Sequence, residues 1–482
     1  MNASRDIAAR LRERLGTDAV LTAPADIAAN LIDHRRLYRG RALAVVLPRS
    51  VEQVSEILAL CNEERIGVVP QGGNTSYCGG ATPDASGRQL VLALRRLDRI
   101  RCVDAAGFTL VVEAGCVLEE VRRAADRAER LFPLSLGSGG SCQIGGNLST
   151  NAGGTQVLRY GMMRDLVLGL EAVLADGRVL SSLSPLRKDN TGYDVKSLFL
   201  GSEGTLGIIT AASLKLYPKV RSTATAFVAV PSVQAAVDLL GQLRDVCADL
   251  VSAFELLPRL AVDLTVRHIE GVVDPLASKA GPQPSGTGYP WHVLCELTSS
   301  GAGEPLGERL EAALGAALER GTVLDAALAQ SERERAAFWR MRENVPEAQR
   351  RDGASLKHDI SVPVQSLPAF VAQASEWLAD HVPEGRLVAY GHVGDGNLHF
   401  NLNQAPGTEG GAFLARGPEI MRSVHDLVKA FDGSFSAEHG IGQLKVGELE
   451  RYGSPVELDL MRAIKRALDP NGILNPGKVL SV

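Results

Sequence analysis

"LGSGGSCQIGGNLSTNAGGTQVLRYG", residues 136–161, gathers glycine, serine, threonine and asparagine into a single stretch. Two related stretches lie on either side of it, "PQGGNTSYCGG" at 70–80 and "LFLGSEGTLGIIT" at 198–210. Such residues after a strand let successive backbone N–H groups converge on an anion, for example a phosphate or diphosphate. Tight turns alone explain one such stretch but poorly explain three. We therefore expect a site for a cofactor that carries a diphosphate.

Two common nucleotide motifs are absent from the sequence. No GxGxxG follows a predicted strand, and no GxxxxGK[ST] occurs. Neither a Rossmann dinucleotide site nor a P-loop is therefore expected.

Periodicity around the glycine-rich stretches predicts a mixed domain of helices and strands over residues 1–219. Strand patterns such as "IGVVP" and "QLVLAL" alternate there with helical patterns such as "SVEQVSEILALCNEER". A second set of elements occupies 220–410, beginning "ATAFVAVP", "SVQAAVDLLGQLRDVCA" and "VSAFELLP". Residues 411–482 read as mostly helical, and 277–288, "ASKAGPQPSGTG", as the most loop-like stretch. We predict three parts with these bounds.

Composition narrows the class of protein. The 482 residues are 45% hydrophobic and 22% charged, with a formal net charge of −5, which argues against nucleic acid as a partner. The seven cysteines form no CxxC pair and indicate reduced thiols in a cytoplasmic protein. No apolar stretch approaches the roughly 20 residues of a membrane span. The N-terminus lacks the apolar core of an export signal.

A predicted hairpin, "GHVGDGNLHFN" at 391–401, carries two histidines. A two-residue turn at Asp395-Gly396 would place His392 directly opposite His399, close enough to bind one metal ion. "SAEHGIG" at 436–442 offers Glu438 as a third ligand. Two imidazoles and a carboxylate suit zinc, iron or manganese and leave positions open for substrate.

The motifs together resemble a known family. The glycine-rich stretches and "RKDNTGYDVKSLFLGSEGTLGIIT" resemble the FAD-binding domain of vanillyl-alcohol-oxidase-type flavoproteins. "GHVGDGNLHFN", "SAEHGIG" and "DPNGILNPGK" resemble their FAD-linked D-2-hydroxyacid dehydrogenase branch, with "LRKDNTGYD" nearest to its D-2-hydroxyglutarate dehydrogenase group. The resemblance implies an α+β fold: a two-subdomain FAD-binding domain, a substrate domain on an antiparallel sheet, and a C-terminal helical part that returns to the flavin.

The resemblance also implies which residues bind FAD. They are Pro70, Gly72, Gly73, Asn74, Thr75, Gly137, Ser141, Gly145, Gly146, Asn147, Thr150, Asn151, Gly153, Glu203, Gly207, Ile209 and Asn475. No histidine lies between residues 35 and 267, so FAD bound non-covalently is expected.

The implied reaction is oxidation of a D-2-hydroxy acid with hydride transfer to flavin. A metal, expected to be zinc, would lower the pKa of the substrate hydroxyl. His439 is the candidate general base, because neutral imidazole accepts a proton near pH 7. Arg342, Lys357 and Asn401 are the candidate substrate contacts, Arg342 because a guanidinium pairs with a carboxylate through two N–H groups.

One departure from the family pattern leaves the substrate open. Pro346 stands where the pattern has a threonine, four residues after the helix arginine. D-2-hydroxyglutarate is the expected substrate, with D-lactate, D-malate or glycolate as alternatives.

Two other classes of function compete with the dehydrogenase. A metallohydrolase leaves the glycine-rich stretches unexplained, and a non-catalytic flavin-binding subunit leaves the metal and base candidates unexplained. We expect electron-transfer flavoprotein or a quinone as the electron acceptor and a homodimer as the default assembly.

Overall fold

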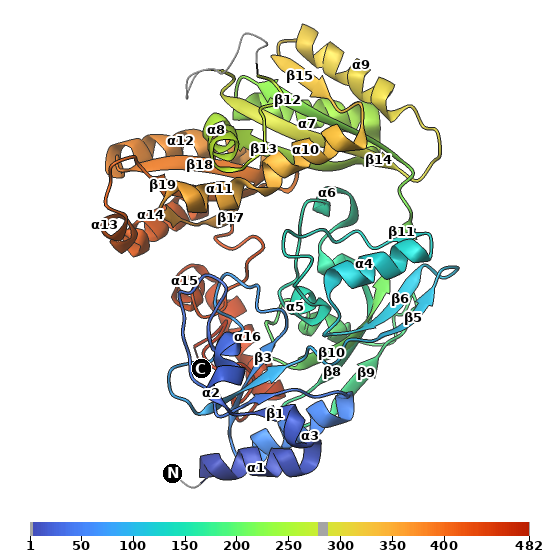
Figure 1. Cartoon of the computed structure of the whole chain (residues 1–482), viewed down its shortest axis with the longest axis vertical. Helices are drawn as coiled ribbons and strands as arrows, with labels where there is room; N and C mark the ends of the chain where they lie inside the picture. Colours follow the sequence, from blue (N-terminus) through green and yellow to red (C-terminus); the bar gives the residue numbers. More distant parts are fainter. Residues whose placement is uncertain (1–2, 278–287, 482) are drawn as a thin grey trace. The chain divides into compact units, whose positions relative to one another are not determined.

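The computed structural model describes residues 3–277 and 288–481 and divides the chain into two compact units (Figure 1). Unit 1 comprises Met1–Gly154, Gly161–Lys219 and Glu438–Val482, and unit 2 comprises Thr155–Tyr160 and Val220–Ala437. Residues 411–437, which the sequence assigned to a C-terminal part, thus cluster with unit 2. The loop expected at 277–288 lies, over 278–287, outside the described residues.

Unit 1 begins with a four-stranded sheet in the order β1-β2-β4-β3. β2, β4 and β3 run parallel, whereas β1 pairs with β2 antiparallel. β2 and β3 lie on either side of β4, and helix α3 (Val51–Glu63) forms the crossover between these two parallel strands, with the Ser50 side chain accepting from Gln53 N at its start. The strands are β1 (Val20–Leu21), β2 (Val45–Val46), β3 (Gly67–Gln71) and β4 (Gln89–Ala93). Helix α1 (Ala3–Leu15) precedes β1, and α2 (Pro24–Ile27) lies between β1 and β2.

A second sheet of unit 1 is antiparallel, in the order β5-β6-β10-β8-β9. Its strands are β5 (Ile100–Asp104), β6 (Thr109–Glu113), β8 (Val167–Val173), β9 (Val179–Ser182) and β10 (Ile208–Lys215). A short ribbon joins β7 (Arg130–Leu131) to β11 (Tyr217–Pro218), and helices α4 (Leu118–Arg127) and α5 (Ile144–Ser149) complete the unit before its last segment.

The end of the chain returns to the first sheet of unit 1. After α15 (Val446–Tyr452) and α16 (Pro455–Leu468), Leu474 forms a parallel bridge with Val68 of β3. Buried Lys465 fixes this return, since its ammonium donates to the carbonyls of Thr205 and Leu474 and to Asp469. The last 45 residues are therefore an integral part of unit 1.

Unit 2 is built on an antiparallel sheet in the order β15-β12-β14-β13-β18-β19-β16, with β17 also paired to β19. β14 lies between β12 and β13 and pairs antiparallel with both, so β12, the helix after it and β13 form a β-α-β unit whose two strands run in the same direction without being neighbours. The strands are β12 (Ser222–Val230), β13 (Val251–Pro258), β14 (Trp291–Ser299), β15 (Asp325–Leu328), β16 (Ser355–Leu356), β17 (Asp359–Ser361), β18 (Gly385–His392) and β19 (Asn397–Gln404).

Helices cover both faces of this sheet, as side-chain alternation along the strands requires. Ala226 and Val228 of β12 pack in one cluster and Phe227 between them in another. The first cluster contains α7 (Val233–Cys247), α9 (Leu306–Glu319), α12 (Leu367–His381) and α14 (Gly417–Ala430); the second contains α8 (Arg259–His268), α10 (Glu332–Glu343) and α11 (Val345–Asp352). The short helices α6 (Val157–Tyr160) and α13 (Gly410–Ala415) also belong to unit 2.

The register predicted for the histidine hairpin is wrong by two residues. Tyr390, not His392, pairs with His399, because the turn spans Val393–Asp395 and Gly396 instead of two residues. Of the turn's Asp-Gly pair only Gly396 has a positive φ, +83°, and its amide donates to Val393 O. Side chains repeat their direction every two residues, so a shift of two keeps both histidines on one face. Their ring centroids are 5.5 Å apart.

Two further expectations concern the whole chain. Within 3–277 and 288–481, no helix is long and apolar enough to cross a bilayer. None of the seven cysteines forms a disulfide, and six of them are buried. Burial raises the pKa of the Cys61 and Cys295 thiols to about 12, which makes them poor nucleophiles.

Candidate functional site

The glycine-rich stretches meet in unit 1, just after β3. A Cβ added to Gly73 would lie 2.0 Å from the backbone oxygen of Ser141, so the two loops contact each other through glycine backbone. A Cβ on Gly146, in contrast, would meet no atom within 4 Å. Glycine is thus required for loop contact at Gly73, whereas at Gly146 it keeps an open face on the first turn of α5.

Three buried oxygens around these loops have no hydrogen-bond partner within the described part of the chain. They are Gln143 Oε1, Asn147 Oδ1 and Asn475 Oδ1. Buried polar atoms are rarely left unsatisfied, so acceptors of this kind indicate that a bound group donates to them. FAD, with its ribityl hydroxyls and ring N–H, fits this set of acceptors.

Glu203 and Asn475 connect the third stretch to the C-terminal segment. The Glu203 carboxylate accepts from the amides of Ile441 (2.7 Å) and Gly442 (2.8 Å), and burial raises its pKa. Asn475 Nδ2 donates to the carbonyls of Gly80 and Glu203. Both side chains therefore hold loops of unit 1 together.

The other residues predicted to bind FAD also lie in unit 1. They lie at the end of β3 and in the loop after it (Pro70, Gly72, Asn74, Thr75), in α5 and its flanks (Gly137, Gly145, Thr150, Asn151, Gly153) or at the start of β10 (Gly207 just before it, Ile209 within it). The sequence motifs did not indicate Gln143, yet a Cβ added to Gly72 would lie 3.4 Å from its Oε1 atom.

Glu438 and His439 begin the last segment of unit 1. Glu438 Oε1 accepts from the backbone amide of Gly154 at 3.0 Å, which places the carboxylate at the end of the central glycine-rich stretch. The His439 ring lies 4.6 Å from the Tyr77 ring, in the first glycine-rich stretch. The candidate base His439 and the candidate third ligand Glu438 thus contact the loops that are predicted to bind the flavin.

In unit 2, His392 belongs to a buried charged network. Its Nδ1 lies 2.6 Å from Glu255 Oε1, and Arg342 Nε donates to Glu255 Oε2, also at 2.6 Å. Although burial alone would raise the Glu255 pKa, Arg342 and His392 lower it to about 2. Glu255 is therefore an ionised carboxylate inside the protein.

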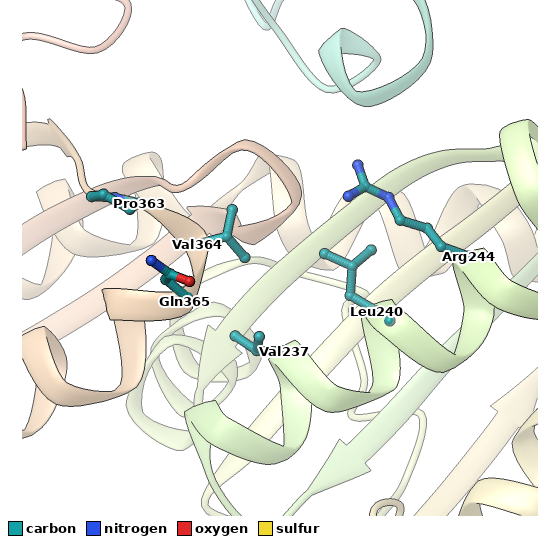
Figure 2. A pocket seen from close by; sticks show the side chains of 7 residues that line it. Val237, Leu240, Arg244, Pro363, Val364 and Gln365 are labelled. Atoms are coloured by element: carbon teal, nitrogen blue, oxygen red, sulfur yellow. The ribbon is translucent and has the colours of Figure 1, made fainter.

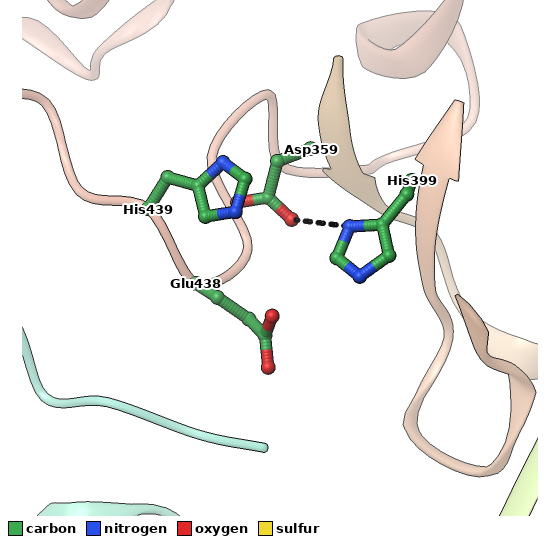
Figure 3. Close-up of side chains that lie close together, drawn as sticks. All are labelled: Asp359, His399, Glu438 and His439. Carbon is green, nitrogen blue, oxygen red and sulfur yellow. Dashed lines mark ion pairs between the residues drawn. The ribbon is translucent and has the colours of Figure 1, made fainter. Parts of the chain in front are cut away.

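His399 stands beside a second buried carboxylate. Its Nδ1 is 3.9 Å from Asp359 Oδ1, the pair joined by the dashed line in Figure 3. Asn397 Nδ2 donates to the same oxygen at 3.0 Å. The carboxylate hydrogen-bonded to Nδ1 of His392 matches the surroundings of a metal-binding imidazole, whereas the His399–Asp359 distance is too long for a hydrogen bond; two imidazoles with carboxylates close by are a donor set that fits zinc. Figure 3 also draws Glu438, which belongs to unit 1.

The three candidate substrate contacts lie on the same face of the unit 2 sheet, with Gln349 of α11 between two of them. Lys357 Nζ and Asn401 Nδ2 both donate to Gln349 Oε1, at 2.7 and 3.1 Å. The Arg342 guanidinium lies 4.9 Å from the Tyr390 ring centroid. Pro346 occupies the first turn of α11, where proline needs no amide donor and helps start a helix.

Sequence reasoning missed Glu255, Asp359 and Gln349. The signal for Glu255 was present, because it is the one ionisable residue in the otherwise apolar or uncharged strand "VSAFELLP". Asp359 and Gln349 had no such signal, since each stands among other polar residues.

A surface pocket in unit 2 lies apart from this network. Val237, Leu240 and Arg244 of α7 line it together with Pro363, Val364 and Gln365 (Figure 2). α7 packs on the face of the sheet opposite to α10 and α11. The pocket is therefore not part of the candidate site.

Comparison with known proteins defines the class first. Residues 219–479 match the family described as "FAD linked oxidases, C-terminal domain", and 42–182 match "FAD binding domain". The crystal structure of p-cresol methylhydroxylase with substrate bound aligns with a TM-score of 0.76 at 18% identity, over 99% of this chain and 97% of that one, which shows a common fold. The chain belongs to the FAD-linked oxidases and is an FAD-dependent dehydrogenase with a vanillyl-alcohol-oxidase-type fold, as its motifs predicted.

Two relatives with similar sequences have names that include a substrate. "D-2-hydroxyglutarate dehydrogenase, mitochondrial" of Arabidopsis thaliana is 39% identical over 99% of this chain and 82% of its own length. "D-2-hydroxyglutarate dehydrogenase" of Xanthomonas citri is 37% identical over 95% of this chain and 93% of its own length.

Proposed function

We propose that the protein oxidises a D-2-hydroxy acid, foremost D-2-hydroxyglutarate, to the 2-oxo acid with the help of FAD and a divalent metal. The names of the relatives support the substrate. The main structural support is the buried network in unit 2, where one carboxylate joins a candidate metal ligand, His392, to a candidate substrate arginine, Arg342. D-2-hydroxyglutarate carries both a hydroxyl, which a metal at His392 could bind, and a distal carboxylate, which Arg342 could pair with.

FAD would be held non-covalently by the glycine-rich loops of unit 1, with Gln143, Asn147 and Asn475 as acceptors for its polar hydrogens. Bound FAD would supply the acceptor for the hydride that leaves C2 of the substrate. Glycine at position 146 leaves room for a group to approach α5 closely.

We propose His392, His399 and Glu438 as the metal ligands, with zinc as the expected ion. Asp359, beside His399, and His439, next to Glu438 in the sequence, also carry groups that can bind a metal, and we assign them other roles. A bound cation lowers the pKa of a coordinated hydroxyl and orients the carbon that bears it.

His439 would accept the hydroxyl proton, as a neutral imidazole is able to do near pH 7. Arg342 would pair with the distal carboxylate of the substrate, and Lys357 and Asn401, which share Gln349 as a partner, would contact its other oxygens. Arginine suits this task because its planar N–H groups match a carboxylate.

D-lactate, D-malate and glycolate are the alternative substrates, because Pro346 removes a hydroxyl that the family pattern contains. We propose electron-transfer flavoprotein or a quinone as acceptor, a homodimer as assembly, and the cytoplasm as the location, the last because the seven cysteines form no disulfide.

An anaerobic screen of D-2-hydroxy acids for bleaching of the flavin absorbance tests the proposal. We expect D-2-hydroxyglutarate to bleach the flavin fastest, and a chelator to slow bleaching without releasing FAD. Bleaching that no D-2-hydroxy acid elicits would refute the function, and bleaching that chelators leave unchanged would refute the metal.

Variants separate the roles of the residues. His439→Ala should retain FAD and metal while slowing flavin reduction by about 10²-fold or more, the usual effect of losing a general base. Arg342→Ala should raise KM for D-2-hydroxyglutarate and D-malate far more than for D-lactate, which has no second carboxylate. Arg335→Ala is the matched control, since Arg335 lies on the same helix and pairs with Glu296. Equal damage with all three substrates would refute the distal role of Arg342.

A further inference from the structure

We propose that Glu255 is a positioning residue that holds His392 in the ring orientation and tautomer needed to bind a metal and, through its second oxygen, fixes Arg342 beside it. The role of Glu255 rests on the proposed function, because it presupposes that His392 binds a metal. Glu255 itself would touch neither the substrate nor the metal.

The sheet places Glu255 opposite His392. β13 and β18 pair antiparallel with Glu255 directly across from His392 and Leu256 across from Gly391. Glu255 is 1% exposed and His392 6%. Directly opposed residues have Cβ atoms about 5 Å apart, so a glutamate side chain reaches the near edge of the imidazole. The contact follows from strand register and needs no loop to keep it in place.

The hydrogen bond determines which ring nitrogen is left for a metal. Arg342, which is always charged, donates to Oε2 of the same group, so Glu255 faces His392 as a paired carboxylate that accepts hydrogen bonds and Nδ1 carries the proton in the 2.6 Å contact. In a neutral imidazole the lone pair then lies on Nε2, at the far side of the ring from Glu255. Removing such a carboxylate partner typically weakens metal binding by about 10- to 100-fold.

The second carboxylate oxygen of Glu255 also orients the side chain of Arg342. Nε of Arg342 donates to Oε2 at 2.6 Å, and the guanidinium carbon lies 4.9 Å from the ring centroid of Tyr390, two residues before His392 on β18. One carboxylate and one aromatic ring thus restrain the arginine next to the histidine. An amide in place of the carboxylate could accept from only one of the two donors, because its NH₂ group would face the other.

Glu296 provides a matched control in the neighbouring strand. It is equally buried, at 1% exposed, and accepts from Arg335, from Trp339 Nε1 and from the hydroxyl of Thr225. It has no histidine among these partners. Glu296→Gln therefore disturbs a buried carboxylate–arginine pair of the same sheet without touching a candidate metal ligand.

The test is a zinc titration of chelator-stripped holoenzyme in competition with a chromophoric chelator, run on wild type, Glu255→Gln and Glu296→Gln. We expect Glu255→Gln to raise the zinc Kd about 10- to 100-fold and to keep full FAD content, whereas Glu296→Gln keeps the wild-type Kd. The effect of Glu255 on Arg342 is measured as the KM for D-2-hydroxyglutarate at saturating zinc. This KM should rise in Glu255→Gln and stay unchanged in Glu296→Gln. Should Glu255→Gln fail to fold, Glu255→Asp keeps the charge but reaches only one donor, and its zinc Kd should also rise.

Two outcomes would overturn the inference. One is a zinc Kd of Glu255→Gln, or of Glu255→Asp in its place, equal to wild type; the other is an equal rise in both Glu→Gln variants, which would show a general loss of packing. His392→Ala distinguishes this failure from failure of the proposed function. If His392→Ala still binds zinc as tightly as wild type, the metal site itself is wrong; if it loses zinc while Glu255→Gln retains it, only the role of Glu255 is wrong.

Discussion

His292→Leu should remove a large part of the acid sensitivity of unit 2. His292 lies on β14 with no exposed surface, and neither ring nitrogen has a hydrogen-bond partner among the described residues. Its ring stacks on Phe227, with centroids 5.4 Å apart. Burial lowers the pKa of His292 to about 4, against the opposing effect of Asp274, so the imidazole is neutral in the folded protein at pH 7.

The magnitude follows from the difference between the folded and unfolded pKa values. An unfolded histidine titrates near pH 6.5, above the folded value of about 4, so the unfolded chain takes up the proton first as the pH falls. The neutral ring therefore stabilises unit 2 fully above pH 6.5, and this contribution is lost between pH 6.5 and 4. Each pKa unit is worth about 1.4 kcal/mol, so the total loss is about 3 kcal/mol.

Tryptophan fluorescence reports the unfolding of unit 2 specifically, because the three tryptophans, Trp291, Trp339 and Trp377, all lie in it. Denaturant midpoints measured from pH 7.5 to 4.5 should fall less steeply for His292→Leu than for wild type, so the two curves converge or cross toward low pH. Phe227→Leu is the control, since it perturbs the same packing without a titrating group and should shift the curve by a constant. Parallel curves for wild type and His292→Leu would refute the reasoning.

Two glycine substitutions make contrasting predictions. Gly146→Ala should lower the FAD content of the purified protein and leave the unfolding midpoint of the FAD-free protein unchanged or slightly raised, because its Cβ meets no protein atom and alanine favours a helix. Gly315→Ala in α9 is the control, since this position is equally open and the substitution should leave the FAD content at the wild-type level. Full FAD retention in Gly146→Ala would place the cofactor elsewhere. Gly396→Ala should destabilise unit 2 by about 2 kcal/mol or more, measured by the same fluorescence, because alanine is strained at a φ of +83° and its Cβ would lie 2.1 Å from Val362 O; a midpoint equal to wild type would show that the turn can rearrange.

Sequence patterns predicted elements well where one periodicity dominates. Helix α3 begins at the capped residue that its sequence indicates, and the strands β12, β13 and β14 coincide with apolar runs. The antiparallel order of unit 2 was not accessible in this way, because apolar runs buried on both faces carry no information about which strands are neighbours. The family resemblance supplied that part of the fold.

The candidate site was predictable in its chemistry but not in its hydrogen bonds. His392 and His399 share a face, as the hairpin suggested, yet the turn is longer than an Asp-Gly pair implies because Asp395 keeps a negative φ. The partner of His392 comes from residue 255, far away in the sequence, so no local pattern could reveal it. Contacts of this kind depend on the order of strands in the sheet, which cannot be predicted from the local patterns of a single sequence.

The division of unit 1 into segments has a consequence for how the protein is made. Residues 438–482 pair with loops formed before residue 220, whereas nearly all of unit 2 lies between them in the chain. At bacterial or eukaryotic elongation rates of about 5–20 residues per second, the ribosome needs roughly 10–45 seconds to add the intervening stretch. During that interval the nascent glycine-rich loops lack Leu474 and Asn475, while residues 220–437, nearly the whole of unit 2, are synthesised as one continuous stretch and are free to fold. Flavin capture should therefore be a late, post-translational event, and chains released early by the ribosome should contain a folded unit 2 without flavin.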